Sequence, residues 1–201
     1  PQGKNATLVA HTVAEGGDQG GEDGGEEESG PLTSLKTGDQ VVIVAPAYNM
    51  ALSATKVATY YNVGVDVSAG FGSITDAEIW VVTVNSDGSY TFTSLTGKVL
   101  AMAADYSSLN EEGENKSWAL EAKEGAEGIF YLKNTVRGNY LEWYASKNNW
   151  STYGTSNLSD LFELSFYRPT DATVGGGETG GETGGEGGET GSKEVTIPEA
   201  L

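Results

Sequence analysis

Short segments rich in β-branched, aromatic and leucine residues recur along the middle of the chain, separated by polar turns. An apolar residue at every second position is typical of a β-strand with one buried face. The only helical candidate, residues 101–105, is too short to stand as a helix. The pattern predicts an all-β domain with strands at residues 40–46, where Pro46 ends the strand, a short strand at 52–54, and strands at 63–67, 78–84, 89–93, 99–102, 118–122, 129–132, 140–143 and 161–167.

One order of features occurs three times along these strands, at steps of 38 to 48 residues. Three copies of about 40 residues, each with four short strands, are typical of a β-trefoil, a barrel capped by three hairpins. The alternative is a β-sandwich, which gives no reason for a threefold repeat. The aligned positions are the pairs Val42/Val44, Tyr90/Phe92 and Phe130/Leu132, then Leu52, Leu100 and Leu141, and last Trp80, Trp118 and Phe162.

The two ends of the chain differ in composition from its middle. Residues 1–30 and 171–201 hold 18 of the 29 glycines, and 14 acidic residues against 2 basic ones. Such sequences bury too little apolar surface to offset the loss of chain entropy, about 1–2 kcal/mol per residue. We expect a fragment of a larger protein, with a disordered tail and acidic Gly-rich linker at 1–30, a folded domain at 31–170, and a Gly/Glu/Thr linker at 171–201 that leads into a following domain.

Composition also narrows the chemistry of the domain. Residues 31–170 carry 15 acidic and 9 basic residues, a formal charge of −6, so contact with nucleic acid is not expected. The lack of cysteine rules out disulfides and thiolate metal sites, and the one histidine, His11, lies outside the predicted domain. No apolar run is long enough to cross a membrane. We therefore expect a protein that is not an enzyme and holds no cofactor or metal.

Aromatic and amide residues are concentrated at positions 138–153, which contain two of the four tryptophans and three of the ten tyrosines. If Leu141 is buried, alternation places Trp143 beside it in the core, and Trp150 and Tyr153 fall in the loop that follows. Sugars present C–H faces to rings and hydroxyls to amides. The segment therefore predicts a carbohydrate site, with local packing as the alternative; its residues are Tyr144, Lys147, Asn148, Asn149, Trp150 and Tyr153.

Two resemblances extend this interpretation. The segments 78–80 (Glu-Ile-Trp) and 116–118 (Lys-Ser-Trp) stand where ricin-type lectins carry Gln-x-Trp, with Glu and Lys in place of Gln. The segments 87–92 and 137–151 resemble a module of large secreted proteins of Gram-positive bacteria, which also hold nuclease- or phosphatase-type domains. This second resemblance covers most of residues 31–168.

The resemblance to secreted bacterial proteins implies an extracellular or cell-surface location. The module would bind carbohydrate or neighbouring domains of its own chain. Alternatively, it would be a structural or protein-interaction spacer, accessory to a secreted nuclease or phosphatase. No catalytic residue is implied for the module itself.

Overall fold

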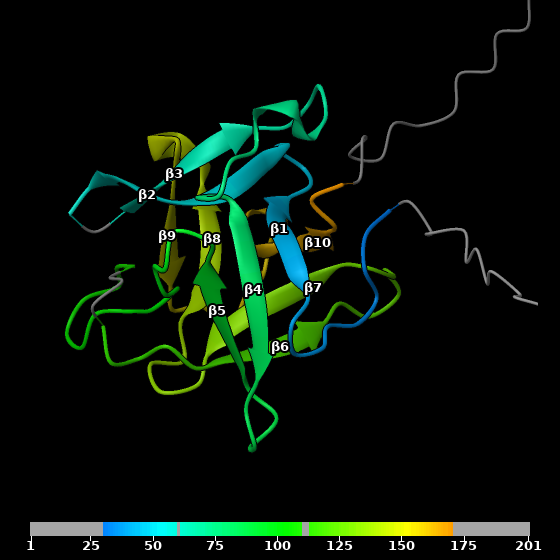
Figure 1. Ribbon diagram of the computed structural model, residues 1–201. Coiled ribbons are helices and arrows are strands. Elements are labelled where there is room, and N and C mark those ends of the chain that lie inside the picture. Colours follow the sequence, from blue (N-terminus) through cyan, green and yellow to red (C-terminus); the bar gives the residue numbers. More distant parts are fainter. Residues whose placement is uncertain (1–29, 60, 110–112, 171–201) are drawn as a thin grey trace, which may run out of the picture.

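The computed structural model describes residues 30–59, 61–109 and 113–170, and within them it contains ten β-strands and three short 3-10 helices (Figure 1). The strands are β1 (Gln40–Ala45), β2 (Met50–Ala58), β3 (Tyr61–Asp66), β4 (Ile79–Val84), β5 (Tyr90–Ser94), β6 (Trp118–Ala122), β7 (Phe130–Asn134), β8 (Tyr140–Tyr144), β9 (Asn149–Tyr153) and β10 (Ser165–Tyr167). The 3-10 helices are η1 (Phe71–Ser73), η2 (Ala145–Lys147) and η3 (Asp160–Phe162).

Six of these strands form a closed barrel. Strand β1 pairs with both β10 and β4, and the antiparallel pairs continue from β4 through β5 and β6 to β7. A bridge between Phe130 of β7 and Leu164, just before β10, completes the ring. Because a closed barrel has no free sheet edge, a small all-β domain of this kind needs no disulfide to protect one.

The chain passes through three lobes: lobe 1 (residues 40–84), lobe 2 (90–122) and lobe 3 (130–167). Lobes 1 and 3 each insert a hairpin, β2–β3 and β8–β9, and Asn62 pairs with Trp150 where the two hairpins meet. In lobe 2, bridges from Met102 to Leu109 and Asn115 take the place of hairpin strands. Figure 1 shows both hairpins on the same side of the barrel. The predicted β-trefoil is confirmed.

The core repeats with the lobes. The Trp80 indole donates a hydrogen bond to the carbonyl of Leu52 at 2.9 Å, and the Trp118 indole donates to that of Leu100 at 2.8 Å. Phe162 is also buried in lobe 3, but its ring has no N–H to donate. The residues that the repeat aligned as lobe-end aromatics are therefore buried in all three lobes.

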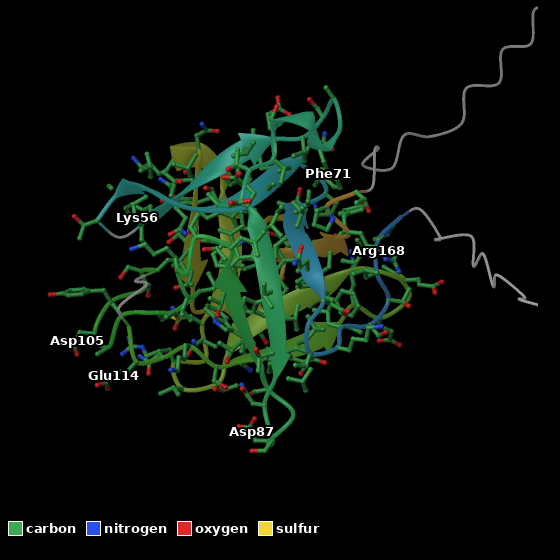
Figure 2. All side chains as sticks on the ribbon, in the orientation of Figure 1. Lys56, Phe71, Asp87, Asp105, Glu114 and Arg168 are labelled. Atoms are coloured by element: carbon green, nitrogen blue, oxygen red, sulfur yellow. The ribbon has the colours of Figure 1, made fainter. Side chains whose placement is uncertain are left out.

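The repeat aligned Val42 and Val44 with Phe92, Phe130 and Leu132 of the main core, and this alignment is wrong by one residue in β1. Val41 and Ile43 lie in the main core, whereas Val42 and Val44 belong to a second buried cluster that includes Phe71 of η1, labelled in Figure 2. Because β1 is covered on both faces, its apolar residues run without alternation. A one-residue shift exchanges the two faces, and the sequence held no polar position to exclude that shift.

Three element boundaries also differ from the prediction. Residues 99–102 form isolated bridges instead of a strand, the first part of 161–167 belongs to η3, and the loop expected after residue 144 contains β9. Only one large apolar residue, Trp150, marks β9, so its alternation was too weak to recognise. The predicted linkers at 1–30 and 171–201 lie outside the described residues, apart from Gly30.

Candidate functional site

The six predicted site residues all lie in or beside the lobe-3 hairpin, β8–β9, but not on one face of it. Tyr144 ends β8, Lys147 belongs to η2, and Asn148 connects η2 to β9 with a left-handed φ of 53°. The remaining three, Asn149, Trp150 and Tyr153, are in β9. The six residues therefore belong to one hairpin, but some lie on its outer face and others on its inner face.

Trp150 is not a surface ring, so the expectation that it stands in a loop and faces a ligand is wrong. Its side chain is 0% exposed and packs edge-on against Trp143, with ring centroids 5.6 Å apart. Its indole N–H donates to the carbonyl of Ala51 in β2 at 3.2 Å, which ties the lobe-3 hairpin to lobe 1. Trp143 is buried beside Leu141, as alternation predicted.

The outer face of the hairpin carries the exposed candidates. Residues directly opposite each other in an antiparallel pair share a face, and the register pairs Tyr144 with Asn149 and Glu142 with Ser151. Tyr153, paired with Tyr140, is on the same face. Tyr144 is 37% exposed and Tyr153 58% exposed, and four strand residues, about 13 Å, separate their positions along the hairpin.

Asn149 occupies the turn end of this outer face. Its side chain is buried, and its amide N–H donates to the carbonyl of Lys147 at 3.2 Å. Its Oδ1 is buried without a hydrogen-bond partner within the described residues. Lys147 and Asn148 are exposed beside it. The turn thus holds one amide oxygen that the protein itself leaves unsatisfied.

Glu142 is the site residue that the sequence did not reveal. Only 6% of the residue is exposed, and no hydrogen bond or ion pair joins its carboxylate to another described residue; the carboxylate oxygens are nevertheless not fully buried, so they reach the surface. Burial raises the pKa of its carboxyl group above the usual value. A carboxylate that is largely buried but whose oxygens reach the surface can accept hydrogen bonds from a ligand. The sequence offered one signal for this residue, a glutamate between aromatic residues in a predicted strand. Alternation alone, however, predicts that such a glutamate is exposed to solvent.

A loop from lobe 2 packs onto this hairpin. Ser107 accepts a hydrogen bond at its hydroxyl from the Asn139 amide at 3.0 Å, and at its carbonyl from the Ser151 hydroxyl at 3.5 Å. The Arg137 guanidinium donates to the carbonyl of Ala104. Ser151 is the cross-strand partner of Glu142, so the lobe-2 loop (residues 103–109) reaches the strand position where the unpartnered carboxylate lies.

Unsatisfied polar atoms are concentrated in this region. Three buried side-chain atoms of the described chain lack a hydrogen-bond partner: Ser108 Oγ in the lobe-2 loop, and Asn149 Oδ1 and Thr152 Oγ1 in the lobe-3 hairpin. Thr152 faces the other way, since it pairs with the core residue Leu141. A buried polar atom without a hydrogen-bond partner costs about 1–3 kcal/mol, so each of these three atoms requires an explanation.

The equivalent places in the other lobes hold no comparable groups. Glu142 follows the aligned residue Leu141; the residue after Leu52 is Ser53, and the residue after Leu100 is Ala101. The Ser53 hydroxyl accepts a hydrogen bond from the Thr55 N–H at 3.0 Å. A hollow of about 710 Å³ lies elsewhere, between residues 30–40 and the β6–β7 turn. It begins at Gly30, the first described residue, and its rim mixes positive and negative side chains. We therefore place the candidate site in lobe 3.

Two further searches cover the described ranges only. No helix there is long and apolar enough to cross a bilayer. No group of three or more histidine, aspartate or glutamate side chains in the same ranges gathers closely enough to hold a metal ion. Neither search identifies a second site.

Comparison with known proteins supports the fold. No protein-family model and no curated protein sequence matches the chain. Among solved structures, the BEL β-trefoil is 11% identical with a TM-score of 0.55, and the match covers 70% of this chain and 99% of that one. The ricin B-like lectin of Macrolepiota procera, solved with lactose, is 12% identical with a TM-score of 0.54, covering 68% and 100%.

An enzyme is also among the similar structures. The endo-β-galactosidase of Clostridium perfringens that releases GlcNAcα1-4Gal is 10% identical with a TM-score of 0.52, over 64% of this chain and 32% of the enzyme. At these identities the likenesses establish a shared β-trefoil fold and no shared activity.

Proposed function

We propose that this domain is a non-catalytic carbohydrate-binding module and that the outer face of the lobe-3 hairpin is its binding surface. One observation carries the proposal: Glu142, a largely buried residue whose carboxylate oxygens reach the surface and pair with no described residue, lies along the hairpin between the positions of the exposed Tyr144 and Tyr153. The same fold in a lectin solved with lactose supports a sugar as the class of partner.

The chemistry of the face suits a sugar. A carboxylate is an acceptor of up to four hydrogen bonds, and neighbouring sugar hydroxyls are donors that such a group can accept from in pairs. Hydrogen bonds to a charged group are stronger than neutral ones, and the apolar C–H face of a sugar ring packs on tyrosine. Because about 13 Å separates the positions of the two tyrosines, one monosaccharide does not reach both, and an oligosaccharide fits better.

A titration followed by NMR tests this proposal on the full chain. Lactose, chitotriose and xylotriose are added in turn at millimolar concentration, and amide shifts are mapped along β8 and β9. We expect shifts that cluster at Glu142, Tyr144 and Tyr153 for at least one of these sugars. If none of the three sugars, nor any glycan on an array, binds at this hairpin, the proposal is wrong.

The Glu142→Gln variant tests whether the carboxylate of Glu142 contributes to sugar binding. It keeps the shape of the side chain and removes the charge, so affinity for a bound sugar is expected to fall about tenfold to a hundredfold. Glu124→Gln, an exposed glutamate in the β6–β7 turn, removes the same charge far from the hairpin and is expected to bind like the wild type. Equal losses in both variants would point to overall charge and away from a site at Glu142.

A spacer role is the second candidate function. It is favoured by the likeness to the Clostridium perfringens enzyme, because the match spans only 32% of that chain and the trefoil is thus one part of a larger protein. In the same way this module would belong to an extracellular or cell-surface bacterial protein and contact neighbouring domains of its chain. Titrations without any sugar-induced shift, together with loss of activity of an adjoining catalytic domain when 31–170 is deleted, would favour this function.

A further inference from the structure

The outer face of the lobe-3 hairpin carries a carboxylate and no positive charge. On this face Glu142 lies directly opposite Ser151, and Asn149 and Tyr153 are its diagonal neighbours across the strand pair. Neither β8 nor β9 contains a lysine, an arginine or a histidine. The two strands that carry the charge of Glu142 therefore hold nothing that neutralises it.

The basic residues of the surrounding elements are engaged elsewhere or stand apart. The Lys133 ammonium of β7 pairs with a carboxylate oxygen of Glu121 in β6 at 3.9 Å. Arg137, in the turn before β8, donates to a backbone carbonyl of the lobe-2 loop. Lys147 is exposed in the hairpin turn, and within the described residues no ion pair joins it to Glu142. The pKa of Glu142 is accordingly raised by burial, with no positive charge nearby to lower it.

A cation would complete this face better than a neutral group. Because only 6% of Glu142 is exposed, water solvates its ionised carboxylate poorly. A sugar hydroxyl supplies a hydrogen bond alone, whereas an ammonium group supplies a hydrogen bond and a positive charge, and bonds between charged groups are the stronger ones. Tyrosine rings also attract cations, and the exposed Tyr144 and Tyr153 stand on either side along the hairpin.

We propose that the preferred ligand of this hairpin is an oligosaccharide with free amino groups, such as a glucosamine oligomer, and that Glu142 binds one of its ammonium groups. The inference rests on the proposed function and names the class of sugar. The formal charge of −6 on residues 31–170 adds a general attraction for a cationic sugar. The same charge disfavours sugars that carry carboxylate or sulfate groups.

Two trisaccharides form a matched pair for the test. The glucosamine trimer has the rings and linkages of chitotriose, with ammonium groups in place of the neutral N-acetyl groups. Each is titrated into the full chain slightly below neutral pH, where the amines are protonated, and amide shifts are mapped by NMR. We expect the glucosamine trimer to bind at β8 and β9 about threefold to tenfold more tightly than chitotriose. This advantage should shrink as salt is added.

Two glutamate variants locate the charge that is recognised. The control is needed because the whole chain, with a formal charge of −18, attracts any cation. Glu142→Gln should bind the two trisaccharides about equally. Glu124→Gln removes the same formal charge from the exposed β6–β7 turn and should keep the preference of the wild type for the glucosamine trimer.

The outcomes separate this inference from the proposed function. If chitotriose binds at the hairpin as tightly as the glucosamine trimer, the amine is not recognised and the inference is wrong, while the proposed function stands. If Glu142→Gln keeps the preference, or if the glucosamine trimer shifts signals only outside β8 and β9, the attraction is a general one and the inference is equally wrong. If neither the glucosamine trimer nor any other glycan binds at this hairpin, both proposals are overturned.

Discussion

The two regular hairpins of the molecule handle their buried polar groups in opposite ways. In lobe 1, the Asn62 amide donates to the carbonyl of Ser53 at 2.7 Å, and its oxygen accepts from the Lys56 ammonium at 2.8 Å. In lobe 3, one atom each of Asn149 and Thr152 is buried without a partner within the described ranges, and the surface-reaching carboxylate of Glu142 pairs with no described residue. The hairpin of lobe 1 thus satisfies these polar groups with internal hydrogen bonds, whereas the hairpin of lobe 3 leaves polar groups without a partner.

This difference separates stability from function within one domain. A satisfied amide network such as that of Asn62 contributes to folding, whereas each unsatisfied group costs about 1–3 kcal/mol. A hairpin that keeps such groups is less stable than the fold allows, which is common at binding surfaces. Under the proposed function, lobe 1 has a structural role and lobe 3 the recognition role.

The largest expected effect comes from the ring that joins the two hairpins. Trp150→Ala removes a fully buried indole and its hydrogen bond to Ala51, so the free energy of unfolding should fall by about 3–5 kcal/mol. Urea denaturation measures the loss. Trp150→Phe keeps most of the volume and should lose less, about 1–3 kcal/mol. A change below about 1 kcal/mol in the alanine variant would restore the view of Trp150 as a surface ring.

A second variant tests how closely lobe 1 supports the lobe-3 hairpin. Gly64 of β3 faces the ring of Trp143, and a Cβ at this position would overlap ring atoms. Gly64→Ala should therefore lower the free energy of unfolding by about 1–3 kcal/mol. Gly72→Ala, where a Cβ meets no atom within 4 Å, should change it little. If both variants unfold alike in urea, the hairpins are not packed as tightly as the structure shows.

The smallest effect is a pH-dependent one at Glu142. Its pKa is raised by burial, so the unfolded chain releases this proton at lower pH than the folded chain does. Its contribution to stability is present below the usual glutamate pKa and is lost as pH rises through the raised value. Glu142→Gln removes that loss, so the variant should melt above the wild type at neutral pH and close to it in acid.

Melting curves from about pH 4 to pH 8 measure this difference. Hydrogen bonds from Ser68 and Ser89 lower the pKa of Asp66 and Asp87, so these groups make stability fall in acid, equally in both proteins. The difference between variant and wild type therefore isolates Glu142. If the difference in melting temperature between variant and wild type does not widen as pH rises, the carboxyl group of Glu142 is solvated. The contrast between the polar groups of lobe 1 and lobe 3 would then not extend to Glu142.

Much of the fold could be predicted because its signals are local. Strands were predicted at 118–122 and 140–143, and they are observed at 118–122 and 140–144; the recurrence of leucine and a large aromatic residue predicted the three lobes. The strand β1 was predicted, but its inward-facing residues were not, because burial of both faces removed the alternation; β9 was missed because a single tryptophan was its only strongly apolar residue. In each case a contact distant in sequence decided which face was buried.

The sequence by itself determined an all-β chain with a threefold repeat, and it located the unusual aromatic segment of lobe 3. Only the tertiary structure decided which of its residues face outward. Trp150 is in the core because β2 accepts its hydrogen bond, and the lobe-2 loop packs beside the position of Glu142 from more than 30 residues away. Periodicity records a residue's neighbours along the chain, whereas burial and hydrogen bonding of a side chain depend on neighbours that only the closed barrel brings together.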